Sequence, residues 1–246
     1  MNLFVQAFAW IFDGSHWVSG PNIWQRLGET LWVSGISVLI SVVIAVPIGV
    51  AIGHTGRGRS AAILISNAAR ALPTLGLLSL LILLMGIGVL PPVIVLVILG
   101  IPPTLAGAYA GVEAVDRQTI DAARALGMTE WQIITRVELP LAANLLVGGI
   151  RATALQTVAT LTVASYFAFG GLGLYLVNGL AQADYVQMLA GAVLVTALAL
   201  LVDGAFAIVQ RLVVPRGVAR GRVDPDGPQK RARAPRPRAL QEGMQS

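Results

Sequence analysis

Residues 121–140 read Asp-Ala-Ala-Arg-Ala-Leu-Gly-Met-Thr-Glu-Trp-Gln-Ile-Ile-Thr-Arg-Val-Glu-Leu-Pro, a polar block between long apolar runs. Asp116, just before it, is well placed as an N-cap, and the sequence that follows favours a helix. Gly127 suits the left-handed position that ends a helix. Thr129 and Gln132 fit a capping box that begins a second short helix. The block therefore predicts two short helices joined at a glycine, an element that offers a surface to a partner protein.

The second short helix is predicted to end at Leu139-Pro140, because proline lacks a backbone donor, and the chain then enters the membrane. Trp131, Ile133 and Ile134 are its candidate apolar contact residues. A partner protein is one interpretation of this surface. The alternative is an amphipathic loop that rests on lipid headgroups or folds back on its own helices.

The composition is that of a membrane protein, with 56% hydrophobic residues, 12% charged residues and a mean hydropathy of +0.76. The absence of cysteine excludes disulfides and thiolate metal sites. Basic residues flank the apolar runs or gather in the C-terminal tail, so the high pI does not indicate nucleic-acid binding.

Five apolar segments are predicted to cross the membrane, which takes about 20 residues of helix. The uncharged run 71–112 is too long for one crossing, and the Gly-Ile-Gly-Val-Leu-Pro-Pro segment at 86–92 is its expected break. The expected fold is all-α, with spans near 30–53, 62–86, 92–112, 141–167 and 187–212.

Lys and Arg predict the orientation of these spans. They concentrate after the first span, in the polar block 113–140 and from Arg211 onward. Five crossings place these three segments on one face, so we expect that face to be cytoplasmic, with the N-terminus outside and the C-terminus inside. The first basic residue is Arg26, so no cleavable signal peptide is expected.

The two ends of the chain have their own character. Within residues 1–27, Phe4, Phe8 and Phe12 repeat every four residues, which suits a helix in the outer membrane interface. A sixth span is the alternative there. Residues 216–246, rich in Arg, Ala, Pro and Gly, are predicted to form a disordered basic tail.

The polar block resembles the EAA loop of ATP-binding-cassette importer permeases. The matching positions are Asp121, Ala122, Ala123, Gly127, Val137, Leu139 and Pro140, with Asp in place of Glu and Val in place of Ile as the departures. The resemblance implies that this loop inserts into a groove on a nucleotide-binding subunit and transmits its closure to the spans. It also implies the type I importer fold, in a cell membrane.

The resemblance extends over residues 28–215. Asn67–Thr74 resembles the segment that opens the second span in small five-span permeases. The osmoprotectant branch, whose substrates are glycine betaine, carnitine and choline, is most like this chain at Arg136–Ala142, Gly148–Arg151 and Phe169–Gly173. Methionine-type permeases share much of this pattern. The implied partners are an ATPase subunit, a second permease subunit (identical or different) and an extracytoplasmic binding protein.

No Gly-x-x-x-x-Gly-Lys-Ser/Thr phosphate loop is present, so ATP and magnesium are expected on the partner ATPase. We expect this chain to bind no cofactor and to be no enzyme. His16 and His54 fall on opposite sides of the predicted membrane, and surface or interfacial roles are expected for both.

Three charges fall within the predicted spans, at Arg70, Arg151 and Asp203, at similar depths. A lone charge at the bilayer centre costs about 3 kcal/mol on insertion scales, so pairing is expected. Asp203 is predicted to pair with Arg151 or with Arg70. The alternative is that each arginine reaches the cytoplasmic interface by itself.

Polar and aromatic residues suggest a substrate path, for which packing contacts are the alternative role. Hydroxyl and amide groups follow the fourth span, and aromatic faces suit a quaternary ammonium ion. The candidates are Gln156, Thr157, Thr160, Thr162, Tyr109, Tyr166 and Phe169. A secondary transporter or a channel would also explain the spans and their charges, but neither requires the capped helix–glycine–helix block. A purely structural membrane scaffold would leave Arg70, Arg151 and Asp203 unexplained.

Overall fold

The computed structural model describes residues 2–18, 22–167 and 169–213, all within the first of two compact units, Met1–Val214. The predicted tail 216–246 lies outside the described residues. The described chain contains no strand. Its helices are α1 Leu3–Phe12, α2 Ser15–Val18, α3 Ile23–Thr55, α4 Arg59–Ala71, α5 Thr74–Met85, α6 Leu90–Glu113, α7 Arg117–Ala125, α8 Glu130–Ile133, the π-helix η1 Ile134–Glu138, α9 Leu139–Ala164, the 3₁₀ turn η2 Ser165–Phe167, α10 Gly173–Ala181 and α11 Tyr185–Val213.

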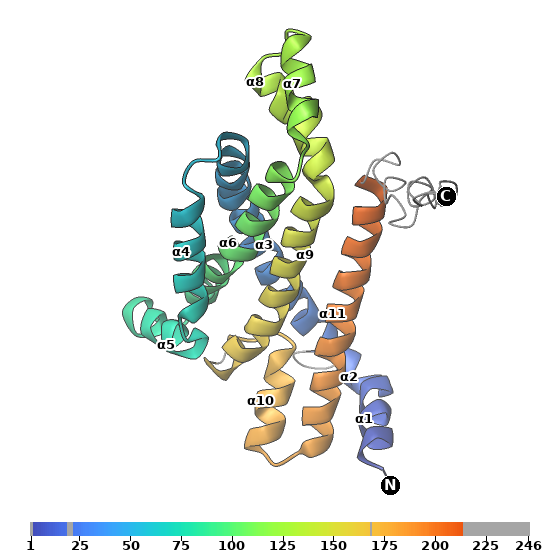
Figure 1. The fold of residues 1–246 in the computed structure, drawn as a ribbon. Coiled ribbons are helices and arrows are strands. Elements are labelled where there is room, and N and C mark those ends of the chain that lie inside the picture. Colours follow the sequence, from blue (N-terminus) through green and yellow to red (C-terminus); the bar gives the residue numbers. More distant parts are fainter. Residues whose placement is uncertain (1, 19–21, 168, 214–246) are drawn as a thin grey trace, which may run out of the picture. The chain divides into compact units, whose positions relative to one another are not determined.

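Four helical stretches are long and apolar enough to cross a membrane, namely α3, α6, the run Glu130–Phe167 and α11. α4 and α5 qualify as a pair that is bent by 81° at a short break. The predicted all-α membrane fold is therefore confirmed, with the bent pair as its fifth candidate span. Figure 1 shows α7 and α8 at one end of the helices, here called the loop end, and α1, α2 and α10 at the opposite end.

The segment predicted as one span over 62–86 consists of two helices. The break falls at Leu72-Pro73, where Leu72 has an extended backbone (φ −68°, ψ 129°). The residue before a proline avoids the α conformation, because its backbone meets the proline ring. α5 then ends at Met85, and Gly86 follows with φ of +84°. This second break is the one expected from the glycine–proline segment.

α3, α6 and α9 pack together at the centre of the described chain. α6 and α9 approach so closely that a Cβ atom added to Gly149 would lie 2.7 Å from the carbonyl oxygen of Pro103 and 2.9 Å from the Cα of Gly107. Small residues allow this close approach. In a membrane the hydrophobic effect does not drive helices together, so van der Waals packing stabilises the contact. α11 packs on α9 and α10, and α1 packs on α11.

The N-terminal segment forms two short helices. α1 has 10 residues and ends at Phe12, which is shorter than the roughly 20 residues of a span. Its Ala7 and Ile11 are buried in a cluster that includes Ala190 of α11. Phe4, Phe8 and Phe12 are exposed on α1, so the aromatic repeat faces away from the packed helices.

The turn between α9 and α10 is fastened to the first turns of α3. The carboxylate of Glu29 accepts a hydrogen bond from the backbone N–H of Gly171 at 2.8 Å, and the hydroxyl of Thr30 accepts one from the N–H of Leu172 at 3.0 Å. Gly171 has φ of +72°, a conformation that glycine adopts at little cost. These contacts fix the glycine-rich turn at the end opposite the loop end.

Candidate functional site

The polar block forms the helix–glycine–helix element that the sequence predicts. The Asp116 side chain accepts a hydrogen bond from the backbone N–H of Gln118 at 3.0 Å and caps α7. Gly127 follows α7 with φ of +80°. A Cβ atom on Gly127 would meet nothing within 4 Å, so the left-handed backbone rather than crowding favours glycine at this position.

α8 begins with a complete capping box. The Thr129 hydroxyl accepts from the N–H of Gln132 at 3.4 Å, and the Gln132 side chain accepts from the N–H of Thr129 at 2.9 Å. The box satisfies two backbone donors that the helix leaves unpaired. Together with the Asp116 cap, it gives both short helices defined starts.

The exposed apolar residues of the block differ from the predicted set. Ile133 is fully buried, in a cluster with Val115, Ile120 and Ala123, and Ile134 packs on the neighbouring cluster around Val50. Trp131 remains exposed at 72%, and it is joined by Leu126 at 83%. Leu126 and Trp131 are therefore the large apolar side chains that the block exposes. The prediction for Ile133 and Ile134 is wrong, because these two side chains form the inner face of the element.

The predicted helix end at Leu139-Pro140 is also wrong. A single helical run of 38 residues continues from Glu130 to Phe167, and Pro140 lies in the first turn of α9. The π-helix Ile134–Glu138 directly precedes that turn. Proline lacks the N–H that an α-helix needs at this point, and the wider π-turn accommodates the missing donor without a break.

The residues of the EAA-like pattern divide between the two faces of the block. Asp121, Ala122, Gly127 and Pro140 are exposed, and Ala123 is buried. Val137 packs within the buried cluster of the block, whereas Leu139 packs on the cluster around Val50. Ala123, Val137 and Leu139 therefore hold the element together and join it to α3. The other four positions lie on its outer surface.

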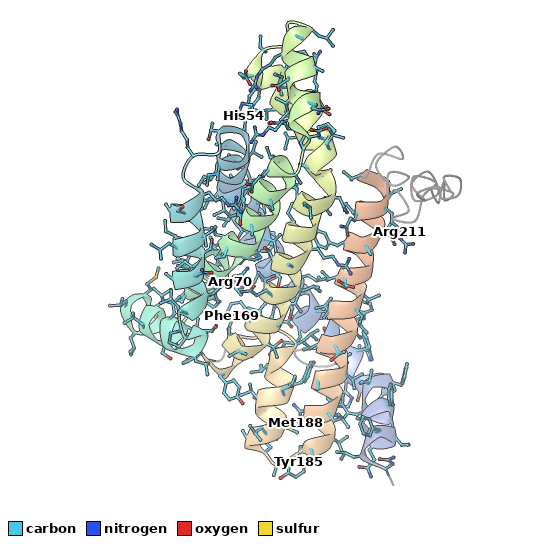
Figure 2. All side chains as sticks on the ribbon, in the orientation of Figure 1. His54, Arg70, Phe169, Tyr185, Met188 and Arg211 are labelled. Carbon is cyan, nitrogen blue, oxygen red and sulfur yellow. The ribbon has the colours of Figure 1, made fainter. Side chains whose placement is uncertain are left out.

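A set of polar contacts joins the block to the end of α3. His54, in the last turn of α3, places Nδ1 at 2.8 Å from Oε2 of Glu138 and Nε2 at 3.2 Å from Oε2 of Glu130. The side chains of His54 and Glu138 are 12% and 1% exposed. Figure 2 shows His54 where α3 meets the block. Of the surface and interfacial roles expected for His54, the surface role is therefore wrong, and the interfacial role stays a prediction.

Glu130 is held in turn by α7. Arg124 donates from Nε and Nη2 to its two carboxylate oxygens at 2.9 and 3.1 Å, and from Nη1 to Asp121 at 3.4 Å. The hydrogen bond to Glu130 raises the pKa of the Arg124 guanidinium above its usual value. Two-point contacts of this kind fix both partners in one geometry, so α7 and α8 keep a defined relative position.

Of the three charges predicted within spans, two are brought together. Arg151 of α9 donates from Nε and Nη2 to the two carboxylate oxygens of Asp203 on α11, each at 2.6 Å. The side chains are 31% and 32% exposed. Arg70 lies exposed in the last turn of α4, where Figure 2 labels it. The structure thus selects Arg151 as the partner of Asp203.

Gln156, a candidate for the substrate path, serves the backbone of α6. Pro102 and Pro103 stand inside α6, and a proline at 103 cannot donate to the carbonyl of Leu99. The side-chain amide of Gln156 donates to that carbonyl at 3.3 Å. Nearby, the Thr153 hydroxyl donates to the carbonyl of Gly100 at 3.0 Å. These contacts supply hydrogen bonds to the proline-containing part of α6.

A cavity of about 160 Å³ lies between α3, α9 and α11. Thr157, 1% exposed, lines it, and its hydroxyl donates to the carbonyl of Ala154 at 2.8 Å. Ser34, 6% exposed, also lines it, and within the described residues its hydroxyl has no hydrogen-bond partner. Phe206 adds an aromatic ring to the wall.

The other path candidates are spread over the structure. Thr160 is half-buried on α9 and Tyr166 is exposed in η2, and the Thr162 hydroxyl donates to its own helix. Phe169 packs on the cluster of α3, α6 and α9. Tyr109 lines a separate pocket with Arg59 and Glu113, at the loop end of α6. Among the described residues, these side chains therefore lie on different elements and at different ends of the helices.

Two residues that the sequence analysis missed are Leu126 and Glu138. Leu126 directly precedes the glycine that ends α7, and an apolar residue on the exposed end of a polar loop was a usable signal. Glu138 stands beside the Leu-Pro pair, and a carboxylate next to a membrane entry needs a partner. His54, the last residue but one of α3, is the titratable group that the fold places opposite it.

Comparison with known proteins identifies relatives over most of the chain. Residues 44–216 match the family model for the binding-protein-dependent transport system inner membrane component. The glycine betaine/carnitine/choline transport system permease protein OpuCB of Bacillus subtilis is 34% identical over 200 residues, which cover 81% of this chain and 92% of that protein. The carnitine transport permease protein OpuCB of Listeria monocytogenes is 32% identical over 204 residues, covering 83% and 94%.

A solved structure shares the fold. The match is to an inward-facing conformation of the MetNI methionine ABC transporter, with a TM-score of 0.67 and 25% sequence identity over 76% of this chain and 94% of that one. The resemblance to importer permeases that the polar block indicates is therefore supported independently by sequence and by fold.

Proposed function

The chain belongs to the family of binding-protein-dependent transport system inner membrane components, and from that premise we propose that it is the membrane-spanning subunit of an ATP-driven osmoprotectant importer. Its substrates are then small quaternary amines such as glycine betaine, carnitine or choline. The observation that carries this proposal is the match to permeases of these substrates over four fifths of the chain, at 34% and 32% identity.

Residues 116–140, here called the coupling segment, are proposed to dock on the ATPase subunit. Leu126, directly after α7, and Trp131 of α8 are large apolar side chains that are exposed. Exposed anchors of this kind fill pockets at protein interfaces. The caps and the Arg124–Glu130 contacts hold the segment in shape before binding. For transport, the segment must make different contacts with the open and closed ATPase.

The loop end is proposed to face the cytoplasm, because the ATPase is cytoplasmic and Lys and Arg concentrate there. ATP and magnesium then bind the ATPase, and we assign no catalytic step to this chain. A second permease subunit and an extracytoplasmic binding protein complete the proposed complex. The end with α1, α2 and α10 is the one that would meet the binding protein.

The geometry revises the substrate path that we propose. We assign Gln156 a role in stabilising α6, since its side-chain amide donates a hydrogen bond to the carbonyl of Leu99. Thr157 stays in the path, together with Ser34 and Phe206, because all three line one cavity. An aromatic face and hydroxyl groups suit a quaternary ammonium substrate. Such contacts are enough for a transient site, since tight recognition belongs to the binding protein.

A methionine-type importer is the second candidate, because its permease has the same fold. The two are separated by reconstituting the chain with its ATPase and binding protein in proteoliposomes. Labelled glycine betaine, carnitine, choline and methionine are then offered in turn. We expect ATP-dependent import of a quaternary amine and none of methionine. Import that persists without any ATPase subunit would instead indicate a secondary transporter.

A further inference from the structure

His54 joins two parts of the molecule that are far apart in the chain. It sits in the last turn of α3, and its two ring nitrogens contact Glu130, the first residue of α8, and Glu138, the last residue of η1. Glu130 is itself held by Arg124 of α7. A continuous series of polar contacts therefore runs from α7 through α8 to α3.

The placement of these groups makes the contacts specific. Glu138 is 1% exposed, and a carboxylate removed from water in this way needs a hydrogen-bonding partner. His54 supplies it from a side chain that is itself only 12% exposed. An imidazolium ring donates from both nitrogens and can serve both carboxylates, whereas a neutral ring donates from one.

The coupling segment reaches α3 by direct contact at few places. Along the chain it continues into α6 at one side and into α9 at the other, and its connection to α9 passes through the π-helix Ile134–Glu138. π-turns lack the regular α-helical hydrogen bonds and occur frequently at functional sites. α3 is not joined to the segment in sequence, so the segment contacts α3 directly only across space, through His54 and through the apolar packing of Ile134 and Leu139 near Val50.

We propose that His54 is a positioning residue for coupling, which transmits displacement of the coupling segment to α3 through Glu130 and Glu138. The inference rests on the proposed function and adds a residue outside the EAA-like pattern to it. In this arrangement an ATPase that pulls α8 also pulls the end of α3. Because α3 packs on α6 and α9, the displacement reaches the centre of the permease directly.

The test compares variants of His54 in the complete complex of permease, ATPase and binding protein. His54→Phe keeps a ring of similar size and removes both donors. His54→Gln keeps two N–H donors on its amide. Arg59→Gln is the matched control, since it removes an ion pair of 2.6 Å between α4 and α6 at the same end, without touching the coupling segment. The measured quantity is the number of substrate molecules imported per ATP hydrolysed.

We expect His54→Phe to lower this ratio by at least about fivefold, the lower range of typical coupling between sites. His54→Gln is expected to recover part of the loss, and Arg59→Gln to match the unaltered chain. The double variant His54→Phe with Glu138→Leu removes the stranded carboxylate. It is expected to restore the yield of folded complex while the ratio stays low, which a merely structural role would not produce.

The outcomes separate this inference from the proposed function. If the unaltered chain binds no ATPase and imports no quaternary amine, the proposed function fails, and the role of His54 fails with it. If the unaltered complex imports its substrate and His54→Phe gives the same ratio, the role of His54 alone is overturned. Recovery of the ratio in the double variant, or an equal loss in Arg59→Gln, would also overturn it.

Discussion

Arg151 on α9 and Asp203 on α11 form a two-point ion pair, with both nitrogen–oxygen distances at 2.6 Å. The pair lies within two candidate spans, where water is scarce and each charge would be costly alone. It joins α11 to the rest of the helices, and only 6% of the apolar stretch of α11 is buried. The pair therefore holds α11 in place through charge as well as apolar packing.

Removal of one member of this pair is predicted to destabilise the protein. Arg151→Ala leaves the Asp203 carboxylate unpaired within a candidate span, where a lone charge is unfavourable. We expect a marked loss of folded protein in the membrane, measured as the monodisperse fraction in detergent. The exchange Arg151→Asp with Asp203→Arg is expected to recover part of that loss. An exchange that behaves no better than either single change would contradict this account.

Substitution at the exposed surface of the coupling segment is predicted to separate folding from coupling. Leu126→Asp and Trp131→Asp place charge on side chains that are 83% and 72% exposed, so the fold is expected to persist. The ATPase subunit is expected to be lost on co-purification, because apolar anchors at interfaces typically contribute about 2 kcal/mol or more. A Leu126→Asp protein that retains its ATPase at unaltered levels would exclude this surface as the docking site.

Gly127→Trp offers a second test of the same segment. A side chain at Gly127 has free space around it, but its backbone has φ of +80°, which costs other residues about 1–2 kcal/mol. We expect the variant to reach the membrane and to hydrolyse ATP without import in the reconstituted complex. Import per ATP at the unaltered level would count against the docking role.

Where α6 and α9 meet, we predict that a side chain at Gly149 destabilises the protein and that a side chain at Gly148 does not. A Cβ on Gly149 meets backbone atoms of Pro103 and Gly107 within 3 Å, whereas on Gly148 the first atom lies at 3.8 Å. Gly149→Ala is therefore expected to lose thermal stability in detergent and Gly148→Ala to keep it. Equal melting temperatures for the two variants would show that the helices separate easily.

Gln156→Leu is predicted to destabilise the helices without changing substrate affinity. It leaves the Leu99 carbonyl without the donor that replaces the N–H of a proline, and an unsatisfied buried acceptor costs about 1–3 kcal/mol. A lower melting temperature with an unchanged KM for import is the expected result. An altered KM with unchanged stability would return Gln156 to the substrate path.

Local signals in the sequence were enough to predict much of the coupling segment. The Asp116 cap, the positive φ of Gly127 and the Thr129–Gln132 box all depend on neighbouring residues, and each is present in the structure. The end of the second helix was not predictable in this way, because Pro140 permits either a stop or a π-turn. Packing on α3 through Leu139 favours the continuous helix, and that contact is not encoded locally.

Contacts between distant residues were predictable only where the alternatives were few. Charge and depth limited the partners of Asp203 to two arginines, and one of them is observed. His54 and Glu138 are 84 positions apart, and nothing near either residue indicates the other. The contact of Gln156 with the Leu99 carbonyl was not predictable for the same reason, because it depends on how α6 and α9 cross.

The continuous helical run Glu130–Phe167 places the coupling segment at one end of a long helix. Its 38 residues extend about 57 Å at about 1.5 Å per residue. Tilting such a rod by about 5° about one end shifts the other by roughly 5 Å, close to one helical turn. Under the proposed function, a partner that tilts the helix at Trp131 is expected to move its far end by this distance, beside the glycine turn that Glu29 and Thr30 contact.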